Sequence, residues 1–220
     1  MSGDDSYQKL RAELARVAGT DDLAQRTLEV VSVVEAVAAP LGIHPVVVGG
    51  MAVYFWTAND AFVTYDIDVV MEVPDRLSAR LAELGFTRTQ DGRHWMLEGT
   101  DIFLEAPSSR LDSDAVVAEI ELPSGRTAKV ISRVDVLIDR IAEFEATGHE
   151  IAVQQALVLF AGISTSEAKD LDTRASSRRL GSILAAVRKL ADDLAAGCPL
   201  PESDELHKIA REASRAEYHS

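Results

Sequence analysis

The strongest constraint on the fold lies between Val46 and Glu72, where a pair of glycines is followed by a closely spaced pair of aspartates. This stretch reads VVVGG, then MAVYFWTANDAFV, then TYDIDVVME. An apolar run that ends in glycines is typical of a buried strand, and the segment after it has the pattern of a short helix. Asp66 and Asp68 flank one isoleucine, so the alternation of a second strand places both carboxylates on the same face.

Two carboxylates side by side on a strand repel each other, and hydrophobic packing gives no reason for the pair. A divalent cation removes the repulsion, because hard oxygen ligands at this spacing bind Mg²⁺. The alternative is a half-exposed edge strand on which Asp66 and Asp68 face water. On this motif alone, a metal site and a solvated strand face both stay open.

Composition narrows the class of protein. The 220 residues are 47% hydrophobic, which suffices for one core, or for a core with a helical appendage. The longest apolar runs fall short of the roughly 18 residues that a membrane helix needs, and the acidic N-terminal segment is unlike a signal peptide. The single cysteine, Cys198, excludes a disulfide framework and a thiolate metal site. We therefore expect a cytoplasmic protein that has no membrane partner.

The formal net charge of −14 bears on possible partners. Non-specific binding to nucleic acids depends on neutralising phosphates with Lys and Arg, which an acidic chain opposes. We therefore expect no DNA partner, and the charge counts against an RNA acceptor. One cluster of basic residues could bind RNA or a nucleotide, although a solvated helix face is the favoured interpretation. The cluster consists of Arg174, Arg178, Arg179, Arg188 and Lys189.

Residue periodicity predicts helices, then a mixed region of strands and helices, then helices again. Helices are expected over 6–18, 22–40, 51–57, 74–84, 133–144, 149–161, 165–175, 178–196 and 203–217. Strands are expected over 46–48, 65–71, 86–89, 95–98, 101–105, 116–122 and 126–131. The pattern predicts an α/β (α+β) fold, with a mixed sheet and N-terminal helices over 1–147 and a helical C-terminal region over 148–220 packed on it.

The central stretch also has features that suit phosphate chemistry. Gly49 and Gly50 allow the backbone to approach a ligand closely, and the following helix offers amide groups to a phosphate. A third carboxylate is expected from the strand at 101–105: Asp101 is preferred, and Glu105 is the alternative on the same strand face. Together these are the parts of a metal-dependent phosphoryl-transfer or nucleotidyl-transfer site, whereas a tight turn and a solvated strand end explain them separately.

Two glycines, a short helix, T-x-D-I-D and a later D-I-x-L strand resemble the nucleotidyltransferase fold of the DNA polymerase beta superfamily. Within it, the likeness is closer to bacterial minimal nucleotidyltransferases and abortive-infection-type toxins, over residues 40–180. The matching positions are Gly49, Gly50, Thr64, Asp66 and Asp68. The resemblance implies a nucleotidyltransferase-type sheet flanked by helices.

The resemblance also implies roles for individual residues. Asp66, Asp68 and Asp101 would be metal ligands for Mg²⁺ or Mn²⁺, and Asp101 would deprotonate the acceptor hydroxyl. The NTP would be bound by Gly49, Gly50, Met51, Thr64, Lys129 and Arg140. Lys129 is better explained as a surface lysine, and His94 beside Trp95 as a hairpin surface pair rather than a base-stacking group.

The implied reaction moves an NMP from an NTP to an acceptor hydroxyl on a tRNA end or a protein, in the toxin of a toxin–antitoxin pair that has an antitoxin partner. A small, aminoglycoside-like acceptor is the next class. A degenerate, non-catalytic binding protein is the rival interpretation, since the chain departs from the family pattern. Met51 replaces a common Ser or Thr, residues 60–63 lack a common Arg, and Arg140 replaces the Lys of related toxins.

Overall fold

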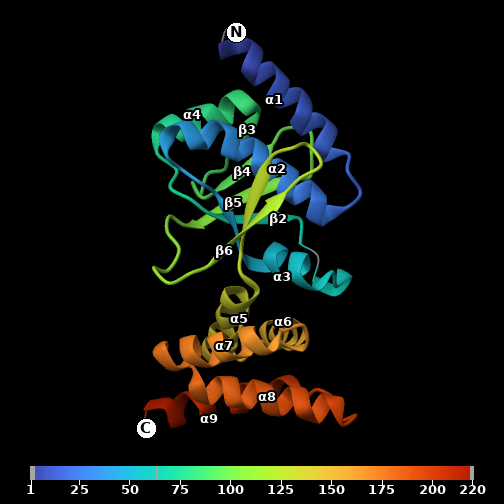
Figure 1. The fold of residues 1–220 in the computed structure, drawn as a ribbon, viewed down its shortest axis with the longest axis vertical. Helices are drawn as coiled ribbons and strands as arrows, with labels where there is room; N and C mark the ends of the chain where they lie inside the picture. Colours follow the sequence, from blue (N-terminus) through green and yellow to red (C-terminus); the bar gives the residue numbers. More distant parts are fainter. Residues whose placement is uncertain (1–2, 63, 219–220) are drawn as a thin grey trace. The chain divides into compact units, whose positions relative to one another are not determined.

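A seven-stranded mixed sheet organises the first part of the chain in this computed structural model, which describes residues 3–62 and 64–218 (Figure 1). Val63, one of the positions at which relatives often carry Arg, lies outside the described residues. Contacts divide the chain into two units, residues 1–132 and 133–220, whereas the sequence pattern places the division after residue 147. The segment between these two boundaries is a helix that packs with the helices after it.

The first unit begins with two helices, alternates strand and helix between Val46 and Arg88, and ends with consecutive strands. The helices are α1 (Gly3–Ala18), α2 (Leu23–Ala38), α3 (Gly49–Thr57) and α4 (Asp75–Leu84), with short 3-10 helices at Ala39–Leu41 and Asp60–Phe62. The strands are β1 (Val46–Val47), β2 (Asp66–Val70), β3 (Phe86–Arg88), β4 (His94–Leu97), β5 (Phe103–Ser108), β6 (Val117–Glu121) and β7 (Thr127–Ile131).

The strand order is β3-β4-β5-β2-β1-β7-β6, so β2 lies at the centre of the sheet. β2 runs antiparallel to β1 and parallel to β5, while β4 runs antiparallel to β5. On the other side, β1 runs parallel to β7, and β7 forms an antiparallel hairpin with β6. This arrangement confirms the predicted α/β fold, a mixed sheet flanked by helices.

The sheet has one buried face. Ile67 and Val69 of β2, Leu104 of β5 and Trp95 of β4 are between 0% and 3% exposed. Helices α1, α2 and α4 pack against one another, and α2 contacts β7 while α4 contacts β3, so they cover this face (Figure 1). Burial of each such side chain stabilises the fold by roughly 1.5–3 kcal/mol.

The turn before β5 is longer than the sequence pattern predicts. The Thr100 hydroxyl donates to the Leu97 carbonyl at 2.8 Å and accepts the Ile102 amide at 3.1 Å. These two hydrogen bonds hold residues 97–102 as a turn, and β5 therefore begins at Phe103 rather than at Asp101. Asp101 is thus a turn residue.

The second unit is helical. It consists of α5 (Arg133–Thr147), α6 (Glu150–Ala161), α7 (Thr165–Ser177), α8 (Gly181–Ala195) and α9 (Ser203–Tyr218). No helix in the described part of the chain combines the length and apolar character required to cross a membrane. A buried ion pair joins two of these helices: Asp135 of α5 accepts from Arg174 of α7 at 2.6 Å, with the two side chains 2% and 11% exposed.

Replacing Asp135 with Ala should destabilise the helical unit, because the buried Arg174 guanidinium loses this carboxylate and keeps the more exposed Asp170, 3.0 Å from its Nε. We expect the free energy of unfolding to fall by about 1–3 kcal/mol, measured by urea denaturation followed by circular dichroism. Asp172→Ala is the matched control, since it removes the partner of Arg188 in a pair whose side chains are 54% and 36% exposed. That change should cost less than about 1 kcal/mol. Equal losses in the two variants would contradict the prediction.

Candidate active site

The two aspartates of β2 share the face of the sheet opposite the buried one. Asp66 is exposed and Asp68 is partly exposed, whereas Ile67 between them and Val69 after them are buried. The alternation predicted from the sequence is therefore present in the strand. It leaves two carboxylates on a face where a ligand can reach them.

The first turn of α3 lies directly against Asp68. Gly49 begins the helix with a φ of +60°, and a Cβ on this residue would stand 2.1 Å from Oδ2 of Asp68. The Val48 amide donates to the Asp68 carbonyl at 2.9 Å, which ties the strand end to β2. Only glycine allows both the left-handed backbone and this close approach.

The second glycine is confined in a similar way. A Cβ on Gly50 would stand 2.9 Å from the Thr64 methyl group. The Thr64 hydroxyl accepts the Asp66 amide at 3.3 Å, so it fixes the start of β2. The structure thus brings Gly49, Gly50, Thr64 and Asp68 together.

The start of α3 presents backbone donors. No side chain caps the helix, so the amides of Gly49, Gly50 and Met51 lack the acceptors that an N-cap side chain would provide. The Met51 side chain is 2% exposed and belongs to the core, so its contribution to a ligand is limited to its amide. Helix N-terminal amides of this kind bind anions.

Strand register decides which carboxylate of the β5 region lies next to the pair. Asp68 is the register partner of Glu105, and Asp66 is the partner of Phe103. Side chains of register partners point to the same face, so Glu105 lies beside Asp68 on the polar face. Glu105, the alternative in the sequence analysis, is therefore the neighbour of the pair.

Asp101 is engaged elsewhere. Its carboxylate pairs with the Arg26 guanidinium of α2 at 3.3 Å. It also lines a hollow of about 880 Å³ next to the C-terminal end of α1. Both contacts are with helices that cover the buried face. Asp101, the third carboxylate preferred from the sequence, therefore does not lie with Asp66 and Asp68 on the polar face.

The carboxylates of the polar face fit a magnesium site that has only two protein ligands. Across residues 3–62 and 64–218, no three His, Cys, Asp or Glu side chains are grouped closely enough to hold a metal ion by themselves. Mg²⁺, however, usually takes one or two protein carboxylates and completes its shell with waters and substrate phosphates. Asp66 and Asp68 offer that number of ligands beside the uncapped start of α3.

Glu105 has a further partner that sequence reasoning missed. His94 of β4 is its register neighbour, and Nε2 of His94 lies 3.0 Å from Oε2 of Glu105. Nδ1 of the same ring lies 2.6 Å from Oδ2 of Asp91. Hydrogen bonds to Asp91 and then Glu105 raise the pKa of His94 above its ordinary value. The Asp-Gly turn and the alternation of β4 were the available signals, but neither gives the register with β5.

Two other predicted nucleotide-binding residues have ordinary ion pairs. Lys129 of β7 has a 27% exposed side chain, and its Nζ is 4.0 Å from Glu119. Arg140 lies in α5 of the helical unit, where it pairs with Asp139 and Glu143 and donates to Gln155 at 3.4 Å. Their roles toward a nucleotide stay predictions.

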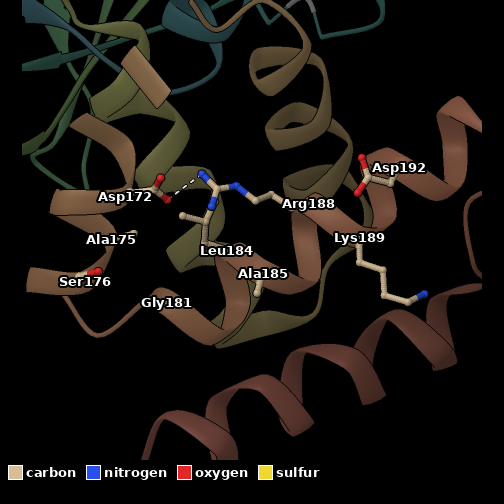
Figure 2. Close-up of a pocket in the computed structure, with 9 residues that line it drawn as sticks. All are labelled: Asp172, Ala175, Ser176, Gly181, Leu184, Ala185, Arg188, Lys189 and Asp192. Atoms are coloured by element: carbon tan, nitrogen blue, oxygen red, sulfur yellow. Dashed lines mark ion pairs between the residues drawn. The ribbon is translucent and has the colours of Figure 1, made fainter. Parts of the chain in front are cut away.

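Carboxylates neutralise much of the basic concentration of the second unit. Arg174 pairs with Asp135, and Lys189 pairs with Asp193 at 2.8 Å. Arg188 points to Asp172 at 2.7 Å across a hollow of about 430 Å³ between α7 and α8 (Figure 2). These pairings favour the solvated helix face over a grip on RNA phosphates.

Comparisons with known proteins bear on the fold. No protein-family model and no curated protein matches the chain. Among solved structures, an antigenic nucleotidyltransferase-like protein from Paracoccidioides brasiliensis superposes with a TM-score of 0.52 at 18% identity, over 77% of this chain and 94% of that one. The antibiotic-resistance factor ANT(2'')-Ia gives a TM-score of 0.44 at 16% identity, over 71% of this chain and 91% of that one. The first likeness shows that the chain has a nucleotidyltransferase-type fold.

Gly49→Ala should cost more stability than the same change at another left-handed glycine. At Gly42, with a φ of +73°, an added Cβ meets nothing within 4 Å, so the cost is about 1 kcal/mol of backbone strain. At Gly49 we expect about 1–3 kcal/mol more, because the new methyl group displaces Asp68. Urea denaturation of the two variants measures the difference. Equal costs would show that Asp68 is not held against this backbone.

Proposed function

We propose that the chain is a nucleotidyltransferase that moves a nucleoside monophosphate from an NTP to an acceptor hydroxyl and releases pyrophosphate. The observation that carries the proposal is the contact between Gly49 and Asp68. It joins the uncapped amides of a helix start to a strand that presents two carboxylates. Phosphate and metal would thereby be bound at adjacent positions, as this chemistry requires.

The triphosphate would lie on the amides of Gly49, Gly50 and Met51, which are aimed out of the first turn of α3. Asp66 and Asp68 would hold Mg²⁺ or Mn²⁺, which when bound neutralises phosphate charge. Thr64 keeps this arrangement in register, because its hydroxyl fixes the amide of Asp66. The chain's own contribution is positioning, which in effect converts a bimolecular step into a unimolecular one.

Glu105 is the residue that we assign as general base. Its position beside Asp68 supports this role, and the Arg26 pairing of Asp101 counts against the other candidate. The Glu105 carboxylate would take the proton of the acceptor hydroxyl. The hydroxyl oxygen would then bond to the α-phosphorus while the bond from that phosphorus to the departing pyrophosphate breaks.

The charge of the chain restricts the classes of acceptor that it can bind. The net charge of −14 and the paired cations of α7 and α8 oppose a long run of RNA phosphates. Of the acceptors expected from the family resemblance, a protein hydroxyl is therefore favoured over a tRNA end. An aminoglycoside-like small molecule is the next candidate, and a toxin–antitoxin role with an antitoxin partner rests on the resemblance alone.

A non-catalytic nucleotide-binding protein is the second candidate function. The burial of Met51 favours it, because the position at which relatives commonly carry a hydroxyl belongs here to the core. The retention of Asp66, Asp68 and Glu105 on one sheet face favours turnover. Binding without transfer is the result that separates the two.

Asp66→Asn and Asp68→Asn should each lower label transfer by at least about 100-fold, because each removes a charge that would hold the metal. The assay incubates the chain with each labelled NTP and Mg²⁺, together with total protein, total RNA or an aminoglycoside. Glu72→Gln is the matched control: it removes an exposed carboxylate just beyond β2 that pairs with Arg110. Wild-type chain that transfers no label but binds NTP through Asp66 and Asp68 would establish the non-catalytic candidate. NTP affinity unchanged in both variants would overturn the site itself.

Glu105→Gln and Asp101→Asn together identify the base. We expect the first to lower kcat by about 10²–10⁴-fold, since general-base catalysis contributes factors of this size, with the KM for NTP nearly unchanged. The second should leave kcat near the wild-type value and affect stability through Arg26. Steady-state kinetics on the labelled acceptor decide between them. The reverse order of effects would restore Asp101 as the base.

A further inference from the structure

His94 lies at the end of a row of polar side chains that crosses three strands. Register pairs Asp68 of β2 with Glu105 of β5, and Glu105 with His94 of β4. The imidazole contacts a carboxylate through each nitrogen, Glu105 at 3.0 Å and Asp91 at 2.6 Å. The orientation of the His94 ring is therefore fixed through both nitrogens, and the group that its Nε2 contacts is Glu105, the base assigned above.

The outer end of the row is anchored in the turn between β3 and β4. Oδ1 of Asp91 accepts the amide of Arg93 at 2.9 Å and the hydroxyl of Thr89 at 2.8 Å. These bonds hold the pKa of Asp91 well below its usual range, so the carboxylate is charged. Its other oxygen, Oδ2, accepts from Nδ1 of His94. The ring is thus oriented by a turn that is itself rigid.

This orientation directs Nε2 at Glu105. Nδ1 faces the charged Asp91 and Nε2 faces a second carboxylate, so both nitrogens act as donors when the ring is protonated. Oε2 of Glu105 is engaged by this donor, while Oε1 is 4.0 Å from the Arg93 guanidinium, beyond hydrogen-bond distance. One oxygen of the base is therefore held, and the other can accept a proton.

We propose that His94 is a positioning residue for Glu105: its Nε2 donor holds the carboxylate beside Asp68, with Asp91 orienting the ring. This inference rests on the proposed nucleotidyl transfer and deepens it. A base must lie within hydrogen-bond reach of the proton that it takes, and a displacement of about 1 Å costs on the order of 100-fold in rate. A flexible glutamate next to two aspartates is otherwise repelled from that position.

Two substitutions at this position separate positioning from a structural role. Gln is long enough to place its amide donor where Nε2 lies, and Asn places its donor where Nδ1 lies. We expect His94→Gln to keep kcat within about 3-fold of wild type, and His94→Asn to lower it by about 10–100-fold. The KM for NTP and the NTP dissociation constant from calorimetry should change by less than about 2-fold in both, because Gly49, Asp66 and Asp68 are untouched.

A purely structural role predicts the opposite order. His94→Asn keeps the contact to the Asp91 turn and should then preserve both the unfolding temperature and kcat, while His94→Gln should lose both. The matched control is His44→Ala, which removes a histidine–carboxylate pair of similar length, with Nδ1 of His44 2.7 Å from Glu35, that has no neighbour in the row.

The outcomes are distinguishable from failure of the function itself. A wild-type chain that transfers no label overturns both proposals. A wild-type chain that is active and impaired by Glu105→Gln, but unaffected by His94→Asn or equally affected by both His94 variants, overturns the positioning role alone. Loss in His94→Asn with recovery in His94→Gln, at unchanged NTP affinity, supports it.

Discussion

The contact between the Gly49 backbone and the Asp68 carboxylate is the constraint on which the polar face depends. It requires a left-handed residue without a side chain at the start of α3, and it requires β2 to present an acid at that position. The Val48 hydrogen bond to the Asp68 carbonyl closes the same junction from the backbone. Movement of either element would separate the helix amides from the carboxylates, so the two halves of the candidate site are one structural unit.

Hydrophobic burial on the opposite face of the sheet offsets the repulsion between the carboxylates of the polar face. Ile67, Leu104 and Trp95 alternate with Asp68, Glu105 and His94 along three neighbouring strands, and the first three are buried under helices. Because hydrophobic burial stabilises the strands from one side, acidic neighbours can be kept on the other. When its ring is protonated, His94 between Asp91 and Glu105 offsets part of the remaining repulsion.

The sequence predicts the elements that depend on local pattern and fails where distant segments meet. Alternation around Ile67 and the paired glycines suffice to predict β2, a short helix after the glycines and the shared face of Asp66 and Asp68, although α3 begins at Gly49, two residues before the predicted start. The choice between Asp101 and Glu105 depends on the register of β5 with β2 and on Arg26, which is 75 positions away from Asp101 in the chain. Likewise, the boundary between the units follows from which helices α5 packs with, a tertiary property that no break in composition marks.

The strand order has a consequence for how such a chain can change over evolutionary time. β3 and β4 occupy one edge of the sheet, and the Asp91 turn joins them at that edge. Insertions or substitutions in this hairpin leave β1, β2 and α3 untouched, because none of these elements pairs with β3 or β4. The hairpin that we assign to positioning Glu105 can therefore diverge independently of the helix start and strand that we assign to the nucleotide, whereas Glu105 itself lies in β5, which pairs with β2.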